Sequence, residues 1–75
     1  MRRVTLAECM KAVIDRFDVS KTKLLSDSHE AKYAVPRLIL MMMAREFTGM
    51  STPAIGRALN RDHSTVIYAT KSIQR

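Results

Sequence analysis

Apolar side chains recur at helical spacing along most of the chain, and no alternating run is long enough to form a sheet. Near the start, Thr5 and Glu8 have the spacing of a capping box, in which each side chain accepts a hydrogen bond from the backbone N–H of the other residue. The apolar positions that follow are Leu6, Cys9, Met10, Val13, Ile14 and Phe17. This pattern predicts a helix from Leu6 to Phe17, with Cys9 on its apolar stripe.

The middle of the chain predicts a short turn, a loop and a long helix. Ser20 can cap a turn that carries Leu24 and Leu25 into the core. Residues 26–32 are polar without apolar periodicity, which predicts a loop. Proline is favoured in the first turn of a helix and glycine just after its end. We therefore expect a helix from Pro36 to Thr48, stopped by Gly49, with the run Met41 to Met43 packing mainly in the core.

A further helix is predicted after Gly49. The sequence Ser51-Thr52-Pro53 restarts helical structure, and we expect Ile55, Ala58 and Leu59 to face inward. This helix should end near Asn60, because asparagine tolerates the left-handed conformation of a tight turn.

The last helix is predicted to begin at Asp62, whose carboxylate can accept from the free N–H groups of the first turn. Val66, Thr70 and Ile73 then have inward spacing. Two short helices joined by so tight a turn, the second opening with polar residues, indicate a helix-turn-helix over about residues 51–74. The fold class predicted for the 75 residues is a small all-α domain, a single domain over 1–75.

Composition adds a preference for anionic partners. Lysine and arginine number 13 against 7 acidic residues, a net charge of +6, and such an excess attracts polyanions. Only one cysteine is present, so no internal disulfide can form, and a reducing compartment is expected. There is no signal-peptide pattern, and the apolar run from Leu38 to Ala44 is too short to span a membrane. We expect a cytoplasmic, nucleoid-associated protein without a membrane partner.

Several kinds of chemistry are disfavoured by the residue pattern. The two histidines and the cysteine lack zinc-ligand spacing, and Ser64 beside His63 on one exposed turn does not form a catalytic triad. The phosphate-loop pattern is absent, since Gly49 and Gly56 are the only glycines. We expect no metal, no cofactor, no nucleotide and no enzymatic activity.

Candidate DNA contacts gather toward the C-terminus. His63, Ser64 and Thr65 stand where an end-on helix would meet a base edge or a phosphate. Combined with the helix-turn-helix, the positive charge indicates phosphate contacts at Arg45, Arg57, Arg61 and Lys71. Tyr68 follows Ser64 by one helical turn and is a further candidate for a backbone contact.

From Ile14 to Ile73 the chain resembles the C-terminal DNA-binding domain of DnaA, the bacterial chromosomal replication initiator. The most specific part is Arg61-Asp62-His63-Ser64-Thr65-Val66, which is close to a family signature. Further matching stretches are Lys23-Leu24-Leu25-Ser26, Ala34-Val35-Pro36-Arg37, Ala44-Arg45-Glu46-Phe47-Thr48 and Pro53-Ala54-Ile55-Gly56.

The resemblance implies an all-helical domain whose helix-turn-helix enters the major groove of duplex DNA at a short asymmetric site, the DnaA box. By position, Asp62, His63, Ser64 and Thr65 become contacts to base edges or adjacent phosphates. The resemblance also implies backbone contacts at Arg45 and Arg61, and places Thr52 with Pro53 where the first helix of the motif approaches the duplex.

The sequence departs from the family in the loop before Pro36. The family has a run of arginines there, one of which reaches the minor groove, whereas residues 26–32 carry a net charge of −1. His29 and Lys32 are the remaining candidates for a minor-groove contact. Val35 also stands where the family usually has arginine, and Asn60 replaces a glycine-containing turn.

The expected function is sequence-preferring binding of double-stranded DNA by a small regulator of transcription or replication. The alternative is a protein-interaction module that kept the fold and lost most DNA affinity, binding a partner through the loop 26–32 or the first helix. The chain has no room for the ATPase module of DnaA. Met1 and the early capping box favour a free-standing DnaA-like domain over a fragment.

Overall fold

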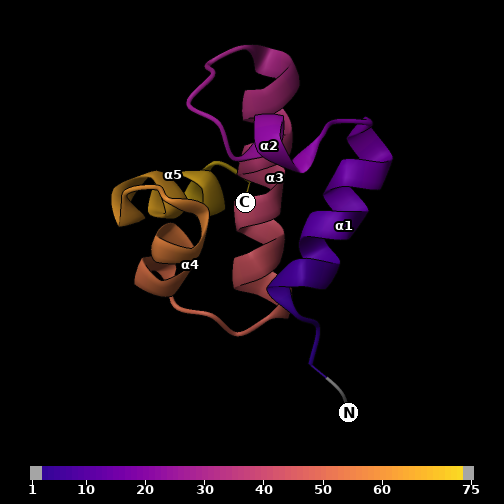
Figure 1. Ribbon diagram of the computed structural model, residues 1–75. Helices are drawn as coiled ribbons and strands as arrows, with labels where there is room; N and C mark the ends of the chain where they lie inside the picture. The colour runs from indigo at the N-terminus through magenta and orange to yellow at the C-terminus, as the bar shows by residue number, and fades with distance from the viewer. Residues whose placement is uncertain (1–2, 74–75) are drawn as a thin grey trace.

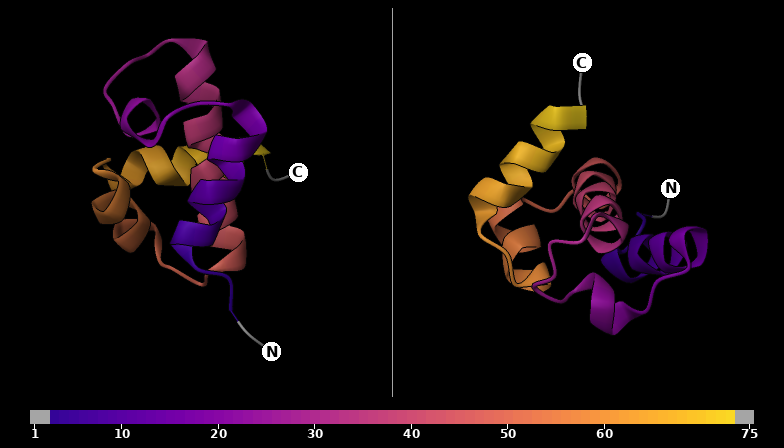
Figure 2. Two further views of the ribbon diagram at one scale, coloured as in Figure 1. Left: turned by 45° about the vertical axis from the view of Figure 1, so that its right-hand side comes forward. Right: turned by 90° about the horizontal axis from the view of Figure 1, so that it is seen from above.

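The computed structural model describes residues 3–73, and over this range it contains five helices and no strand. They are α1 (Leu6–Phe17), α2 (Lys21–Leu24), α3 (Ala31–Phe47), α4 (Thr52–Leu59) and α5 (His63–Ile73). Helix α3 runs through the middle, with α1 on one side and the pair α4–α5 on the other (Figures 1 and 2). The all-α fold class is as predicted. No helix in the described part is long and apolar enough to cross a membrane.

A single apolar core joins the two sides of α3. Its buried members are Cys9, Val13, Leu24, Leu40, Met41, Ala44, Ile55, Leu59, Val66 and Ala69. Among the three consecutive methionines, Met41 is fully buried while Met42 and Met43 are half-buried. Because α3 contributes Leu40, Met41 and Ala44, it supplies the surface against which α1 and α5 both pack.

Helix α1 has the predicted boundaries, and α2 forms the short turn predicted after Ser20, because both begin with local caps. Thr5 and Glu8 form the predicted capping box, with Glu8 N–H donating to Thr5 Oγ1 at 3.2 Å and Thr5 N–H to Glu8 Oε1 at 3.0 Å. Helix α1 ends at Asp18, which is left-handed at φ 53°. Ser20 Oγ then accepts from Lys23 N–H at 3.1 Å and starts α2, which buries Leu24.

The predicted start of the long helix at Pro36 is wrong. Helix α3 begins five residues earlier, at Ala31, so that Pro36 is its sixth residue and the predicted loop 26–32 is too long. The lack of a proline N–H removes only one helical hydrogen bond, the one that the Lys32 carbonyl would accept, and Pro36 is buried in exchange. Glu30 precedes the helix with no side-chain cap, so this start has no local sequence signal. The end is as predicted, with Gly49 at φ 76° directly after Thr48.

Helices α4 and α5 form the predicted helix-turn-helix. Ser51 Oγ accepts from Ala54 N–H at 3.3 Å, and Asn60 is left-handed at φ 55°. A β-carbon on Gly56 would lie 2.6 Å from the Arg61 carbonyl oxygen, so the turn lies directly on the backbone of α4. Ile55 and Leu59 are buried as predicted, but Ala58 is exposed. The inward prediction for Ala58 is wrong because two turns of helix bury only the narrow stripe that Ile55, Gly56 and Leu59 occupy.

Helix α5 packs on α3 and α4 through one face. Val66 and Ala69 are fully buried and Thr70 is half-buried, which confirms the inward direction for Val66 and Thr70. The side chain of Ile73 and position 74 lie outside the described residues.

Candidate nucleic-acid interface

The first turn of α5 presents four polar side chains. Asp62 precedes the helix, and its Oδ1 accepts from Ser64 N–H at 3.4 Å while the Asp62 carbonyl accepts from Thr65 N–H at 3.0 Å. His63 Nδ1 lies 3.4 Å from the same carboxylate oxygen. Asp62, His63 and Ser64 are exposed and Thr65 is half-buried. This turn therefore holds hydrogen-bond donors and acceptors in a fixed helical array that faces solvent.

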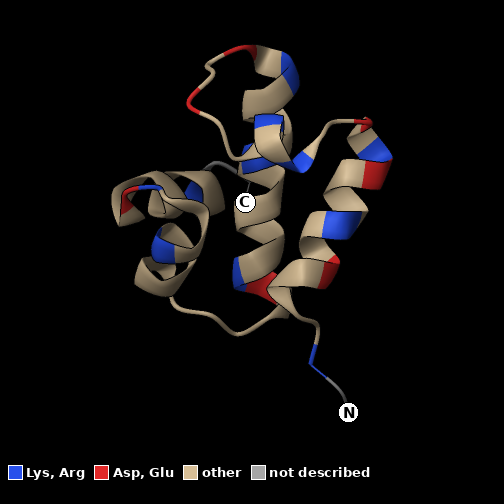
Figure 3. Ribbon diagram, viewed as in Figure 1, with Lys and Arg blue, Asp and Glu red and all other residues tan. Residues whose placement is uncertain are grey.

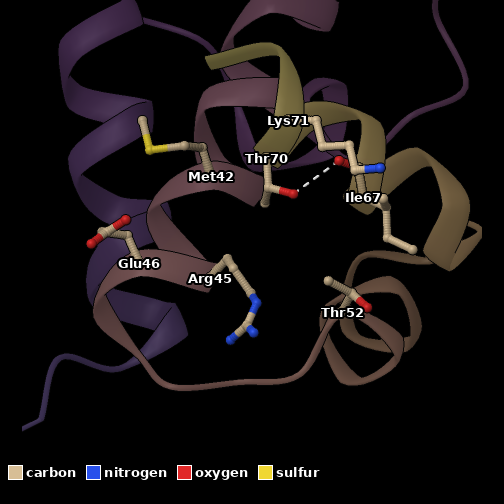
Figure 4. A pocket seen from close by; sticks show the side chains of 7 residues that line it. All are labelled: Met42, Arg45, Glu46, Thr52, Ile67, Thr70 and Lys71. Carbon is tan, nitrogen blue, oxygen red and sulfur yellow. Dashed lines mark hydrogen bonds between the residues drawn. The ribbon is translucent and has the colours of Figure 1, made fainter. Parts of the chain in front are cut away.

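An open hollow of about 560 Å³ lies between α3, the start of α4 and the second half of α5. Its lining includes Arg45, Thr52 and Lys71, three of the predicted backbone contacts (Figure 4). Arg45 is exposed, with Nη1 donating to the Met50 carbonyl at 3.2 Å, and its guanidinium extends into the hollow beside Thr52. Residues from three separate segments thus bring two cations, a hydroxyl and the Glu46 carboxylate to the lining of one hollow, whose net charge stays positive and suits an anion.

The remaining predicted contacts on these helices lie outside that hollow. Arg57 and Pro53 are exposed on α4, and Tyr68 is 64% exposed on α5, one turn after Ser64. Figure 3 shows basic positions on α3, α4 and α5, and acidic positions on α1 and at the C-terminal end of α3, where Glu46 follows Arg45.

Arg61 has partners within the protein. Its side chain is only 14% exposed, Nη2 donates to the Ser26 carbonyl, and Nη1 donates to the Asn60 carbonyl at 3.0 Å. Asp27 lies 3.8 Å from Nη1. The predicted phosphate-contact residue is therefore directed toward the loop before α3.

The loop candidates His29 and Lys32 occupy different elements. His29 is exposed in the loop, whereas Lys32 belongs to the first turn of α3 and its Nζ lies 5.2 Å from the ring centre of Tyr33. The structure does not bring these two side chains together as one basic loop.

Sequence reasoning missed Arg37, the buried charged residue of α3. Its Nε donates to the Leu24 carbonyl at 2.7 Å, Nη1 to Ser28 at 3.0 Å and Nη2 to Lys23 at 3.4 Å. Burial lowers the pKa of the Arg37 guanidinium, nearby Arg61 lowers it further, and Asp27 acts in the opposite direction. No cap or spacing in the sequence marks this role, because the partners of Arg37 are backbone carbonyls of residues 9 to 14 positions away.

A profile of the bacterial DnaA protein helix-turn-helix matches residues 6–73. The chain belongs to this family. It is 39% identical over 74 residues to the chromosomal replication initiator protein DnaA of Wolbachia sp. subsp. Brugia malayi. The matched region covers 97% of this chain and 16% of that protein. Membership in the DnaA helix-turn-helix family implies DNA binding.

Other DnaA proteins give similar matches. The DnaA of Bartonella quintana is 36% identical over 74 residues, covering 97% of this chain and 15% of that protein. The DnaA of Tropheryma whipplei strain Twist is 36% identical over 66 residues, covering 88% of this chain and 14% of that protein. This chain therefore spans about a sixth of the length of these relatives, and it matches their helix-turn-helix part.

Proposed function

We propose that this domain binds double-stranded DNA with sequence preference, with α5 entering the major groove. The observation that carries the proposal is the polar, solvent-facing first turn of α5 beside the cationic hollow of Arg45 and Lys71. In a helix-turn-helix the N-terminal residues of the second helix reach base edges. Asp62, His63, Ser64 and Thr65 are assigned this role, since a carboxylate accepts from cytosine N4 and hydroxyls serve as donor or acceptor.

The backbone contacts in this proposal surround that turn. Arg45 and Lys71 would neutralise phosphates, with the Thr52 hydroxyl as a neutral donor in the same hollow. Arg57, Pro53 and Tyr68 extend the contact surface along α4 and α5. Such contacts fix the register of the domain on the duplex, while the first turn of α5 reads sequence.

The proposed role of this domain is in the regulation of transcription or replication at the nucleoid. Binding requires no catalytic step, cofactor or nucleotide, because recognition uses hydrogen bonds and charge alone. The runner-up, a protein-interaction module, is supported by the acidic residues Asp27 and Glu30 in the loop, where the family carries arginines.

One titration separates the two functions. Affinity is measured at several salt concentrations for a duplex selected from a random pool and for a random duplex of equal length. DNA binding predicts a slope of log affinity against log salt of about −0.9 for each phosphate contact, and tighter binding to the selected duplex. A slope near zero on both duplexes would favour the protein-interaction module. A steep slope with equal affinities would remove the sequence preference and keep the DNA binding.

A further inference from the structure

The loop of residues 25–30 is tied to the helix-turn-helix by one side chain. Arg61 lies in the turn between α4 and α5, and its Nη2 donates to the carbonyl of Ser26, 35 positions earlier in the chain. The Arg61 backbone N–H also donates to the Gly56 carbonyl at 2.7 Å. One residue therefore contacts α4 through its backbone and the loop through its side chain.

The same loop is also held by Arg37 of α3. Arg37 Nη1 donates to the Ser28 carbonyl at 3.0 Å, two residues beyond the carbonyl that Arg61 contacts. Within the loop, Ser26 Oγ accepts from Ser28 N–H at 3.3 Å and Ser28 Oγ accepts from Glu30 N–H at 3.2 Å. The loop is thus fixed by its own hydrogen bonds and by two guanidinium groups.

A phosphate contact by Arg61 fits these surroundings poorly. Its side chain is 14% exposed, and both terminal nitrogens already donate to carbonyl oxygens. The neighbouring Asp27 side chain is fully exposed and negatively charged, so an approaching phosphate would meet a like charge first. The Arg61 guanidinium therefore binds groups of the protein itself.

We propose that Arg61 is a positioning residue, which fixes the loop of residues 25–30 to the first turn of α5 so that the two meet DNA as one rigid reading surface. The proposal rests on the proposed DNA binding. In this role Arg61 does not touch DNA. It orients the neighbouring Asp62 and His63, and so it affects how well the domain discriminates between DNA sequences.

The decisive variant is Arg61→Lys, which keeps the charge and removes the planar fork that reaches two carbonyls at once. We expect discrimination between the selected and the random duplex to fall about tenfold, with the salt slope changed by less than about half a unit. A phosphate contact predicts that Arg61→Lys retains discrimination and slope, and Arg61→Gln lowers the slope by about one. Retained discrimination in Arg61→Lys would overturn the positioning role.

Arg16→Lys and Arg16→Gln serve as matched controls, because Arg16 is an exposed arginine of α1 that lies outside the proposed DNA surface. Both variants should retain the discrimination between the two duplexes and change the salt slope by less than about half a unit. Thermal unfolding of all variants checks that discrimination is compared between folded proteins.

Hydrogen exchange tests the tether without DNA. In Arg61→Lys, the amides of Ser28 and Glu30 should exchange faster, together with those of the first turn of α5, while amides of α1 stay unchanged. If Arg61→Lys does not fold, hydrogen exchange of the unmodified protein provides the test. A tethered loop and turn should open together, so their amides should share one protection factor. Loop amides that exchange as fast as a free peptide would contradict the tether. Absence of salt-dependent DNA binding by the unmodified protein would defeat the proposed function and leave the exchange result standing.

Discussion

Three arginines of this domain have different surroundings, and the surroundings set what each can do. Arg37 is buried and donates to three carbonyls, Arg61 is mostly covered and donates to two, and Arg45 is exposed at the edge of a hollow. A guanidinium whose donors are satisfied inside the protein stabilises structure, whereas an exposed one can exchange water for a phosphate. Phosphate affinity is therefore expected from Arg45.

Replacing Arg45 with alanine should weaken binding to every duplex by a similar factor and lower the salt slope by about one unit, because a phosphate contact carries no sequence information directly. The measurement is a titration at several salt concentrations with the selected and the random duplex. A loss confined to one base sequence would assign Arg45 to base readout instead.

Replacing His63 with alanine should affect mainly the preferred sequence. His63 is exposed on the first turn of α5, and the lost base-edge contact is expected to cost about 1–3 kcal/mol on the selected duplex and little on random DNA. Circular dichroism first verifies that α5 remains helical. An equal loss on both duplexes would make His63 a backbone-positioning contact.

The Cys9 thiol should react slowly with alkylating reagents. Burial raises the pKa of this thiol, and the neighbouring Glu8 carboxylate raises it further. Since the thiolate is the reactive form, less of it is present at pH 8 than in a free cysteine, and access is restricted as well. Across pH 7 to 10, iodoacetamide labelling of Cys9 should keep accelerating beyond the pH at which the labelling rate of a free thiol levels off. Labelling at the rate of an unfolded control would contradict this.

The caps of this domain could be predicted from sequence, but its buried arginine could not. Thr5, Ser20 and Asp62 each bond to an N–H two or three residues later, so the signal lies within one turn. Arg37 bonds to carbonyls up to 14 residues away, and every residue has a carbonyl. Sequence spacing alone therefore does not distinguish Arg37 or Arg61 from a surface cation.

At the scale of elements, the connection between α2 and α3 differs most from expectation. Proline signalled a helix start, but α3 begins at Ala31, with Tyr33 and Ala34 N–H both donating to the Glu30 carbonyl, and this leaves a loop of only residues 25–30. The shorter loop places Lys32 on a helix and leaves His29 as its one imidazole, flanked by Asp27 and Glu30. The predicted boundaries of α1 and α4 are confirmed to within a residue, and α5 follows the predicted cap at Asp62, because these caps are local.

Restoring basic charge to this loop should raise DNA affinity. His29→Arg combined with Asp27→Lys replaces a carboxylate and a weak base with two cations, and we expect the largest gain on duplexes with A·T-rich flanks, whose narrow minor groove favours a guanidinium. Two duplexes that share the major-groove site and differ in flanking A·T content provide the measurement. Equal gains on both would indicate general phosphate attraction, and no gain would place the loop away from DNA.

At the scale of the whole molecule, α3 is the element that both sides share. Helix α1 packs on one side and α5 on the other, and Leu40, Met41 and Ala44 of α3 are fully buried between them. A small domain with one core has no independent second nucleus. The helix-turn-helix and α1 should therefore unfold together.

The variant Leu40→Ala tests whether the helix-turn-helix and α1 unfold together. Removing a fully buried leucine is expected to lower the free energy of unfolding by about 2–5 kcal/mol. Urea unfolding should show one transition, at the same midpoint for helix content and for DNA binding. Two separated midpoints would show that the helix-turn-helix is stable without α1.

The close approach at Gly56 bears on how such a domain can diversify. Where α4 meets the turn, main chain touches main chain, with no side chain between them to serve as an adjustable spacer. The inclination of α5 to α4 is therefore set by this contact and by the buried residues of the two helices, and not by the exposed residues at the start of α5. New binding preferences can therefore arise by substitution of the exposed residues at the start of α5, one at a time. The backbone geometry of the motif stays the same while its exposed side chains change.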